Sequence, residues 1–196
     1  ADYLIKPVNP NQILMSLKKN LHSSSLVSQK ATVDYQKEFS QISSLINNAE
    51  SIDDWYDLYR KIVFWELELA QTETNMDELL AMQKTEANNS FCKFIKRNYE
   101  DWMGAESRPV MSNDVFKRKV FPLLDKGEKV FFILIDNFRL DQWRFIKPLL
   151  SEYFNFEEDL YCSILPTATQ YARNAIFSGL MPSKIEKMFP ELWVDE

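Results

Sequence analysis

Two short apolar runs lead to polar residues whose types could do chemistry. The run Val130–Ile135 stops at Asp136, and the run Leu160–Leu165 leads within a few residues to Thr167 and Thr169. Apolar runs of this length are typical of strands that are buried on both faces of a parallel sheet. Because ligands bind beyond the carboxyl ends of such strands, these side chains would share one edge. A carboxylate and a hydroxyl at that edge could act as a metal ligand and a nucleophile.

A helix is expected to follow the second run, from about Thr169 to Ser178, with Gly179 ending it. Free backbone N–H groups at a helix N-terminus favour anions such as phosphate. Arg173 lies one turn after Thr169 on the same face. It could contact a phosphate oxygen or be solvated, and the sequence leaves both readings open.

Composition limits the classes of function. The chain has 196 residues, three glycines, a net charge of −6 and a pI of about 5.0. Few glycines argue against a long Gly-rich phosphate loop, and the acidic balance argues against a broad basic face for duplex nucleic acid. No apolar run approaches the roughly 20 residues of a membrane span, and no signal peptide opens the chain. A cytoplasmic location is expected.

The middle of the chain predicts a helical bundle over residues 28–105. Ser51 has the features of an N-cap, with Asp53 and Asp54 in the first turn of the helix that follows. Apolar residues then recur at spacings of three and four, which indicates a helix seam: Trp55, Leu58, Ile62, Trp65 and Leu69. Residues 22–30 are rich in serine and favour either a linker or a weakened continuous helix.

Residues 1–27 resemble the last strand and last helix of a response-regulator receiver domain. The resemblance rests on the string Ala1–Pro7, followed by an amphipathic helix over residues 10–21. It implies that Lys6 pairs with a phosphorylated aspartate, that the helix lies on a dimerising face, and that a sensor histidine kinase is a partner. Since that aspartate would lie upstream, we expect the chain to be an internal fragment of a larger protein.

Residues 106–196 resemble the N-terminal part of a PglZ-type domain of the alkaline phosphatase superfamily. The matching residues are Asp136 with Arg139, the string Leu165–Thr169, and Asn174 to Gly179. The resemblance implies an α/β fold and a site with two zinc ions, in which Asp136 and Thr169 bind zinc. It also implies that Thr169 is the nucleophile, with Thr167 as second choice, and it fits Arg173 as a phosphate contact.

The chain departs from that superfamily in its metal ligands. The superfamily requires further Asp and His ligands, and His22, the only histidine here, lies far away in sequence. We expect the remaining ligands beyond Glu196, so this chain alone would hold an incomplete dinuclear site and be inactive.

The predicted fold class is mixed: the tail of an α/β receiver, an all-α three-helix bundle, and the start of an α/β PglZ domain. This order resembles a family of dimeric response regulators that govern type IX secretion, and it implies a zinc-dependent phosphodiesterase acting on nucleotides or oligonucleotides under the control of phosphorylation. The alternative is a non-catalytic regulatory module, in which the PglZ domain binds a nucleotide or protein and phosphorylation switches dimerisation. A phage-defence PglZ protein, which would lack a receiver, is a third reading.

Overall fold

The computed structural model describes residues 10–72, 76–105 and 107–193, with backbone only for residues 11, 12, 14, 15 and 17–25. The chain divides into two compact units. The first comprises the residues up to Arg97 together with Leu140–Ile146, and the second comprises Asn98–Arg139 and the residues from Lys147 onward. The predicted strand over residues 3–5 and the predicted phosphate sensor Lys6 lie outside the described residues.

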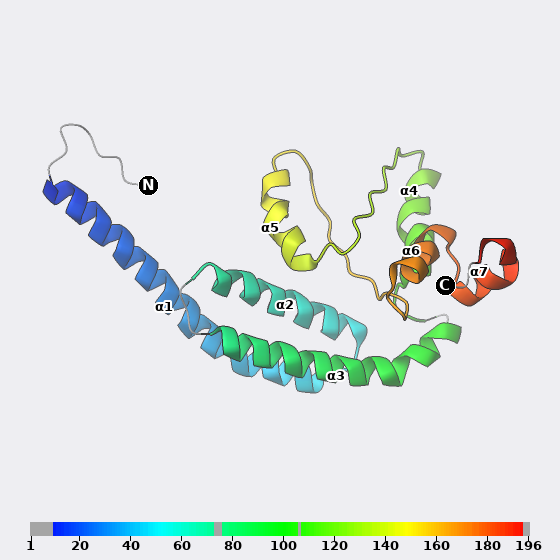
Figure 1. Ribbon diagram of the computed structural model, residues 1–196, viewed down its shortest axis with the longest axis horizontal. Coiled ribbons are helices and arrows are strands. Elements are labelled where there is room, and N and C mark those ends of the chain that lie inside the picture. The colour runs from blue at the N-terminus through cyan, green and yellow to red at the C-terminus, as the bar shows by residue number, and fades with distance from the viewer. Residues whose placement is uncertain (1–9, 73–75, 106, 194–196) are drawn as a thin grey trace. The chain divides into compact units, whose positions relative to one another are not determined.

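Three long helices make up most of the first unit: α1 (Pro10–Asn48), α2 (Ile52–Ala70) and α3 (Asp77–Gly104), whose residues from Asn98 count with the second unit. They lie side by side within this unit (Figure 1). Their apolar faces meet in a core that agrees with the predicted bundle. The buried residues of the predicted seam on α2 are Trp55, Leu58, Ile62, Trp65 and Leu69.

α2 begins at the cap that the sequence predicts. Ser51 Oγ accepts a hydrogen bond from the Asp54 N–H at 3.2 Å, and Asp54 Oδ2 accepts one from the Ser51 N–H at 2.8 Å. This reciprocal pair satisfies two N–H groups that the first turn would otherwise leave unpaired. The hydrogen bond from the Ser51 backbone N–H is the largest of several that lower the pKa of the Asp54 carboxyl.

α1 runs without a break through residues 22–30, so the serine-rich stretch is a helix rather than a linker. The helix predicted over residues 10–21 is therefore the start of a longer one. Ser has a lower helix propensity than Ala, but the difference is below about 1 kcal/mol per residue, so a long helix can continue through three consecutive serines.

A polar pair lies inside the bundle core and joins α1 to α3. Gln83 is 1% exposed, and its Oε1 accepts a hydrogen bond from the Tyr35 hydroxyl at 3.1 Å. Its Nε2 donates to the Phe39 carbonyl at 3.0 Å and to Ser43 Oγ at 3.2 Å. Both polar atoms of the Gln83 amide have partners, so its burial leaves no unpaired group. These hydrogen bonds fix the position of α3 relative to α1.

Burial raises the pKa of the Tyr35 hydroxyl to about 12. Because the folded-state pKa exceeds the unfolded value near 10, stability is fully present below pH 10 and is lost as the pH rises toward 12. We expect the thermal midpoint of the bundle to fall more steeply between pH 10 and 12 in the wild type than in Tyr35→Phe. Differential scanning calorimetry across that range measures the difference, and parallel pH profiles would contradict the expectation.

The second unit consists of short helices joined by extended segments. The elements are η1 (Ser112–Asp114), η2 (Phe116–Val120), α4 (Phe121–Asp125), α5 (Leu140–Leu150, whose residues to Ile146 count with the first unit), α6 (Thr169–Ser178), α7 (Pro182–Met188) and η3 (Pro190–Leu192). Gly179 ends α6 in the left-handed conformation, with φ of 67°, as expected for a glycine at this place.

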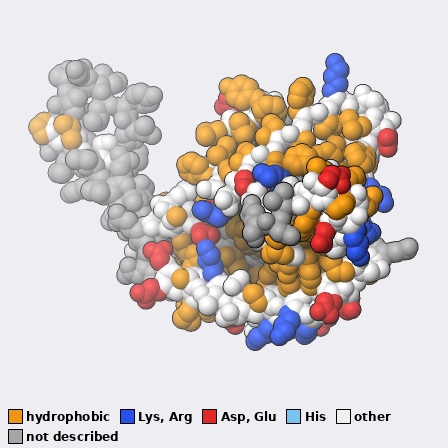
Figure 2. Space-filling model, turned by 45° about the vertical axis from the view of Figure 1, so that its right-hand side comes forward, with side chains coloured by type: hydrophobic (Ala, Val, Ile, Leu, Met, Phe, Trp, Pro, Cys, Tyr) orange, Lys and Arg blue, Asp and Glu red, His pale blue; other side chains and the backbone are white. Residues whose placement is uncertain are grey.

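The predicted strands over 130–135 and 160–165 are not formed in the described part of the chain. A single parallel bridge, Met111 to Cys162, is the only β pairing among the described residues. A buried strand needs a neighbour on each edge, and the first run has none here. Several of its side chains therefore remain in solvent, with Phe131 89% and Ile133 79% exposed. Figure 2 shows how much apolar surface one face of the molecule presents.

The described helices include none with the length and apolarity that a bilayer crossing requires.

Candidate active site

The structure brings together the two side chains that the sequence singles out. Thr169 Oγ1 donates a hydrogen bond to Asp136 Oδ2 at 3.0 Å across 33 residues of sequence. Asp136 is exposed and Thr169 is half-buried, so the pair can be reached from solvent. Thr167, the second candidate, is also exposed, but the hydroxyl that contacts Asp136 belongs to Thr169.

A tight turn after the first apolar run sets the position of Asp136. Asn137 adopts a positive φ of 56°, a conformation that Asn tolerates better than most residues. The Asn137 N–H donates to Asp136 Oδ1 at 3.0 Å. Asp136 therefore has one carboxylate oxygen held by its own turn, while the other accepts from Thr169.

Three aromatic rings hold the extended run against α6. Phe132, four residues before Asp136, lies 4.8 Å from Phe116 and 5.6 Å from Phe177 between ring centroids. Phe116 and Phe177 are 5.6 Å apart. Since Phe177 lies on the same helix as Thr169, this contact places the end of the run beside the start of the helix. Aromatic contacts, and not the expected strand pairing, therefore hold Asp136 close to Thr169.

Thr169 is the first residue of α6, whose N-cap, Ala168, provides no side-chain hydrogen bond. The backbone N–H groups of this first turn thus lack the usual capping acceptor, and they favour an anion. Arg173 lies one turn further along α6 and is exposed. Its guanidinium is at helical spacing from Thr169, and no polar contact between the two is seen in the described residues.

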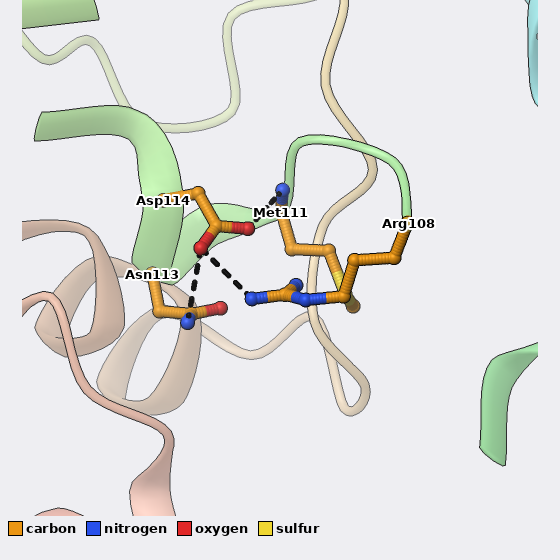
Figure 3. Close-up of polar contacts among 4 residues, drawn as sticks. All are labelled: Arg108, Met111, Asn113 and Asp114. Carbon is orange, nitrogen blue, oxygen red and sulfur yellow. Dashed lines mark hydrogen bonds and ion pairs between the residues drawn. The ribbon is translucent and has the colours of Figure 1, made fainter. Parts of the chain in front are cut away.

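A buried ion pair supports the segment that leads to Thr169. Asp114 is 8% exposed, and it accepts from Arg108 Nη2 at 2.8 Å and from the Met111 N–H at 3.0 Å. Figure 3 shows these groups with Asn113, whose amide is 3.5 Å from Asp114. Ser112 also fixes this segment, because its Oγ accepts a hydrogen bond from the Ile164 N–H at 3.1 Å. The Cys162–Ile164 segment is thereby tied to the turn that Asp114 stabilises.

The sequence analysis missed Arg108, Asp114 and Tyr99 as residues that shape the site. The Tyr99 hydroxyl accepts the Leu165 N–H at 2.6 Å, close to where the chain turns toward α6. The local sequence carries no signal for this contact, since its partners are 66 residues apart.

Asp136 and Thr169 place two side-chain oxygens 3.0 Å apart, and zinc can take oxygen ligands in proteins. A protein-bound zinc ion takes three or four protein ligands, so the pair provides part of a coordination shell. No cluster of three or more His, Cys, Asp and Glu side chains suited to a metal occurs among the described residues. The side chain of His22 is outside that description.

Comparisons with known families match two segments of the chain. Residues 25–103 match the family model of the PorX response regulator linker domain. Residues 115–196 match the BREX system PglZ alkaline phosphatase-like domain. A comparison with curated proteins finds no similar sequence.

Most of the helical unit therefore lies in the segment that matches a response-regulator linker. The Asp136–Thr169 pair lies in the segment that matches an alkaline phosphatase-like domain. The chain combines a PorX-type linker with a PglZ domain, which is the arrangement of a PorX-type regulator and confirms the resemblance found in the sequence.

Proposed function

We propose that this chain belongs to a response regulator whose PglZ domain is a zinc-dependent phosphodiesterase acting on nucleotides or oligonucleotides. The observation that carries the proposal is the Thr169–Asp136 hydrogen bond, which lies in the PglZ-matched segment. A hydroxyl beside a carboxylate at a helix N-terminus is suited to phosphoryl transfer, because the nucleophile, a metal ligand and an anion site coincide.

In this proposal Thr169 is the nucleophile. Its Oγ1 forms a bond to phosphorus while the bond from phosphorus to one alcohol breaks, and the hydroxyl proton ends on that leaving alcohol. The rest of the substrate stays esterified to Thr169 as a threonyl phosphodiester, which water then hydrolyses to release a phosphomonoester and free Thr169. Asp136 orients the hydroxyl through the 3.0 Å hydrogen bond, and both residues would bind zinc. A bound zinc would lower the pKa of the hydroxyl and screen the phosphate charge.

The first turn of α6 and Arg173 would hold the phosphate oxygens. The uncapped N–H groups supply partial positive charge at the helix start. Arg173 is exposed and can swing toward a phosphate bound there, since its guanidinium forms two parallel hydrogen bonds with such an anion.

Regulation of this activity would come from the N-terminal side. We assign residues 1–27 to the end of a receiver domain, 28–105 to the linker bundle and 106–196 to the start of the PglZ domain. A sensor histidine kinase would phosphorylate the receiver in the cytoplasm, Lys6 would pair with the phosphorylated aspartate, and the receiver would form a homodimer. The PorX-type linker supports a role in type IX secretion.

Removal and return of metal tests the proposal. The full-length protein is treated with a chelator and assayed for hydrolysis of bis(p-nitrophenyl) phosphate, first without metal and then with added Zn²⁺. We expect turnover to be lost without metal and restored by zinc, because a metal-activated hydroxyl is the nucleophile. If zinc binds and no turnover returns, the protein is a non-catalytic module that binds a nucleotide or protein instead.

A further inference from the structure

The linker bundle contains an open cavity of about 600 Å³ that is separate from Asp136 and Thr169. It lies where α1 ends and α2 begins, with one face of α3 forming its third wall. Its lining includes Ile46, Ala49, Trp55, Lys93, Lys96 and Arg97. Small-molecule sites in proteins occupy about 300–1,000 Å³, so the volume suits a ligand of nucleotide size.

Three cations on this wall share one face of α3. Lys93, Lys96 and Arg97 have the spacing i, i+3, i+4, which places them together on a helix surface. Among the residues that the structure describes, no acidic side chain lines the cavity. Within the described part of the chain, none of these three side chains has an ion-pair partner. Other lysines of the bundle do have one: Lys84 lies 2.6 Å from Glu66, and Lys61 pairs with Glu38.

The end of α1 does not balance this charge. A helix C-terminus carries only about half a negative charge, so most of the positive charge on Lys93, Lys96 and Arg97 is left uncompensated. Three like charges on one helix face repel one another, and an anion bound among them would relieve that repulsion. The cavity is therefore electrostatically complementary to a small multivalent anion.

A fixed aromatic ring in the wall of the cavity is the second observation. Trp55 is 6% exposed, and its indole Nε1–H is buried with no hydrogen-bond partner among the described residues. The ring is fixed by Phe91 and Phe94 of α3, at centroid distances of 5.3 and 5.9 Å. An apolar or aromatic part of a ligand can pack against this fixed ring.

We propose that this cavity binds a small phosphate-bearing ligand. The phosphate groups lie against Lys93, Lys96 and Arg97, where the planar guanidinium can form two hydrogen bonds with one phosphate. The less polar part of the ligand lies against Ile46, Ala49 and Trp55. The ligand is either a nucleoside diphosphate or inorganic pyrophosphate, which share this phosphate chemistry and differ in the apolar part. The proposal does not depend on phosphodiesterase activity.

Calorimetric titration of the full-length protein with ADP, pyrophosphate or citrate tests the proposal, with a chelator present so that zinc contributes nothing. We expect saturable binding of ADP or pyrophosphate. Lys93→Gln/Lys96→Gln/Arg97→Gln should weaken it by at least about 100-fold, since each charged contact is worth about tenfold. The variant Lys117→Gln/Arg118→Gln/Lys119→Gln, which removes the same charges elsewhere, should bind as the wild type does. Arg97→Lys should lose part of the affinity although the charge remains.

The comparison of ligands distinguishes the two sources. Tighter binding of ADP than of pyrophosphate identifies a nucleotide site, whereas equal binding shows that the phosphates alone are recognised. The proposal is wrong if neither ligand binds saturably, if both triple variants weaken binding equally, or if citrate binds as tightly as pyrophosphate. All six substituted side chains are exposed, and among them only Lys119 has an ion-pair partner in the described part of the chain, Asp159. The variants should therefore fold, and circular dichroism checks this.

Discussion

Thr169→Ala is expected to reduce zinc-dependent hydrolysis of a phosphodiester by roughly a thousandfold or more in the full-length protein. The substitution removes the oxygen that would attack phosphorus and that donates to Asp136 Oδ2. Thr169→Ser keeps the hydroxyl and should retain a large part of the rate. Steady-state assays with bis(p-nitrophenyl) phosphate measure these rates.

Thr167→Ala is the matched control for this substitution. It removes the same side chain two residues earlier, from an exposed position that makes no contact with Asp136. We expect its rate to stay within a few-fold of the wild type. If Thr167→Ala lost as much activity as Thr169→Ala, the nucleophile would have been assigned to the wrong threonine, or the whole Pro-Thr turn would be disturbed.

Asp114→Ala is expected to destabilise the second unit by about 3 kcal/mol, because removing one partner of a buried ion pair leaves the other unpaired. The Arg108 and Asp114 side chains are 17% and 11% exposed, so water compensates little for the loss. The Met111 N–H also loses its acceptor. Urea denaturation followed by tryptophan fluorescence measures the change in the free energy of unfolding.

Asp159→Ala provides the comparison for this prediction. Asp159 pairs with Lys119, but the two side chains are 69% and 52% exposed. An exposed pair contributes about 0–1 kcal/mol, so this variant should unfold close to the wild type. Equal destabilisation by the two substitutions would mean that the Arg108–Asp114 pair does not support the unit in the way that its burial indicates.

The local parts of the fold could be predicted from the sequence. The Ser51 cap and the apolar seam of α2 follow from residue types at fixed short spacings, and both are observed. The continuity of α1 was left open, because a serine-rich stretch favours a linker locally while the length of the helix is set by packing along the bundle.

The sequence places Asp136 near Thr169, and the two side chains are hydrogen-bonded in the structure, but not for the reason that the sequence indicates. Strand pairing was expected to bring Asp136 to Thr169, whereas contacts of Phe132 with Phe116 and Phe177 hold the two segments together without a sheet. Apolar runs report that a segment prefers burial, and they do not report which neighbour covers it. The Tyr35–Gln83 and Tyr99–Leu165 contacts were missed for the same reason, since their partners are 48 and 66 residues apart.

The central claim is that Thr169 and Asp136 act as one catalytic unit, and a double-variant comparison tests it most directly. Phosphodiester hydrolysis with zinc is measured for the wild type, Thr169→Ala, Asp136→Asn and the variant with both substitutions. If the pair is one unit, the double variant loses no more than about the worse single variant, because residues that act together are strongly non-additive. Losses that multiply, or a double variant as active as the wild type, would contradict the claim.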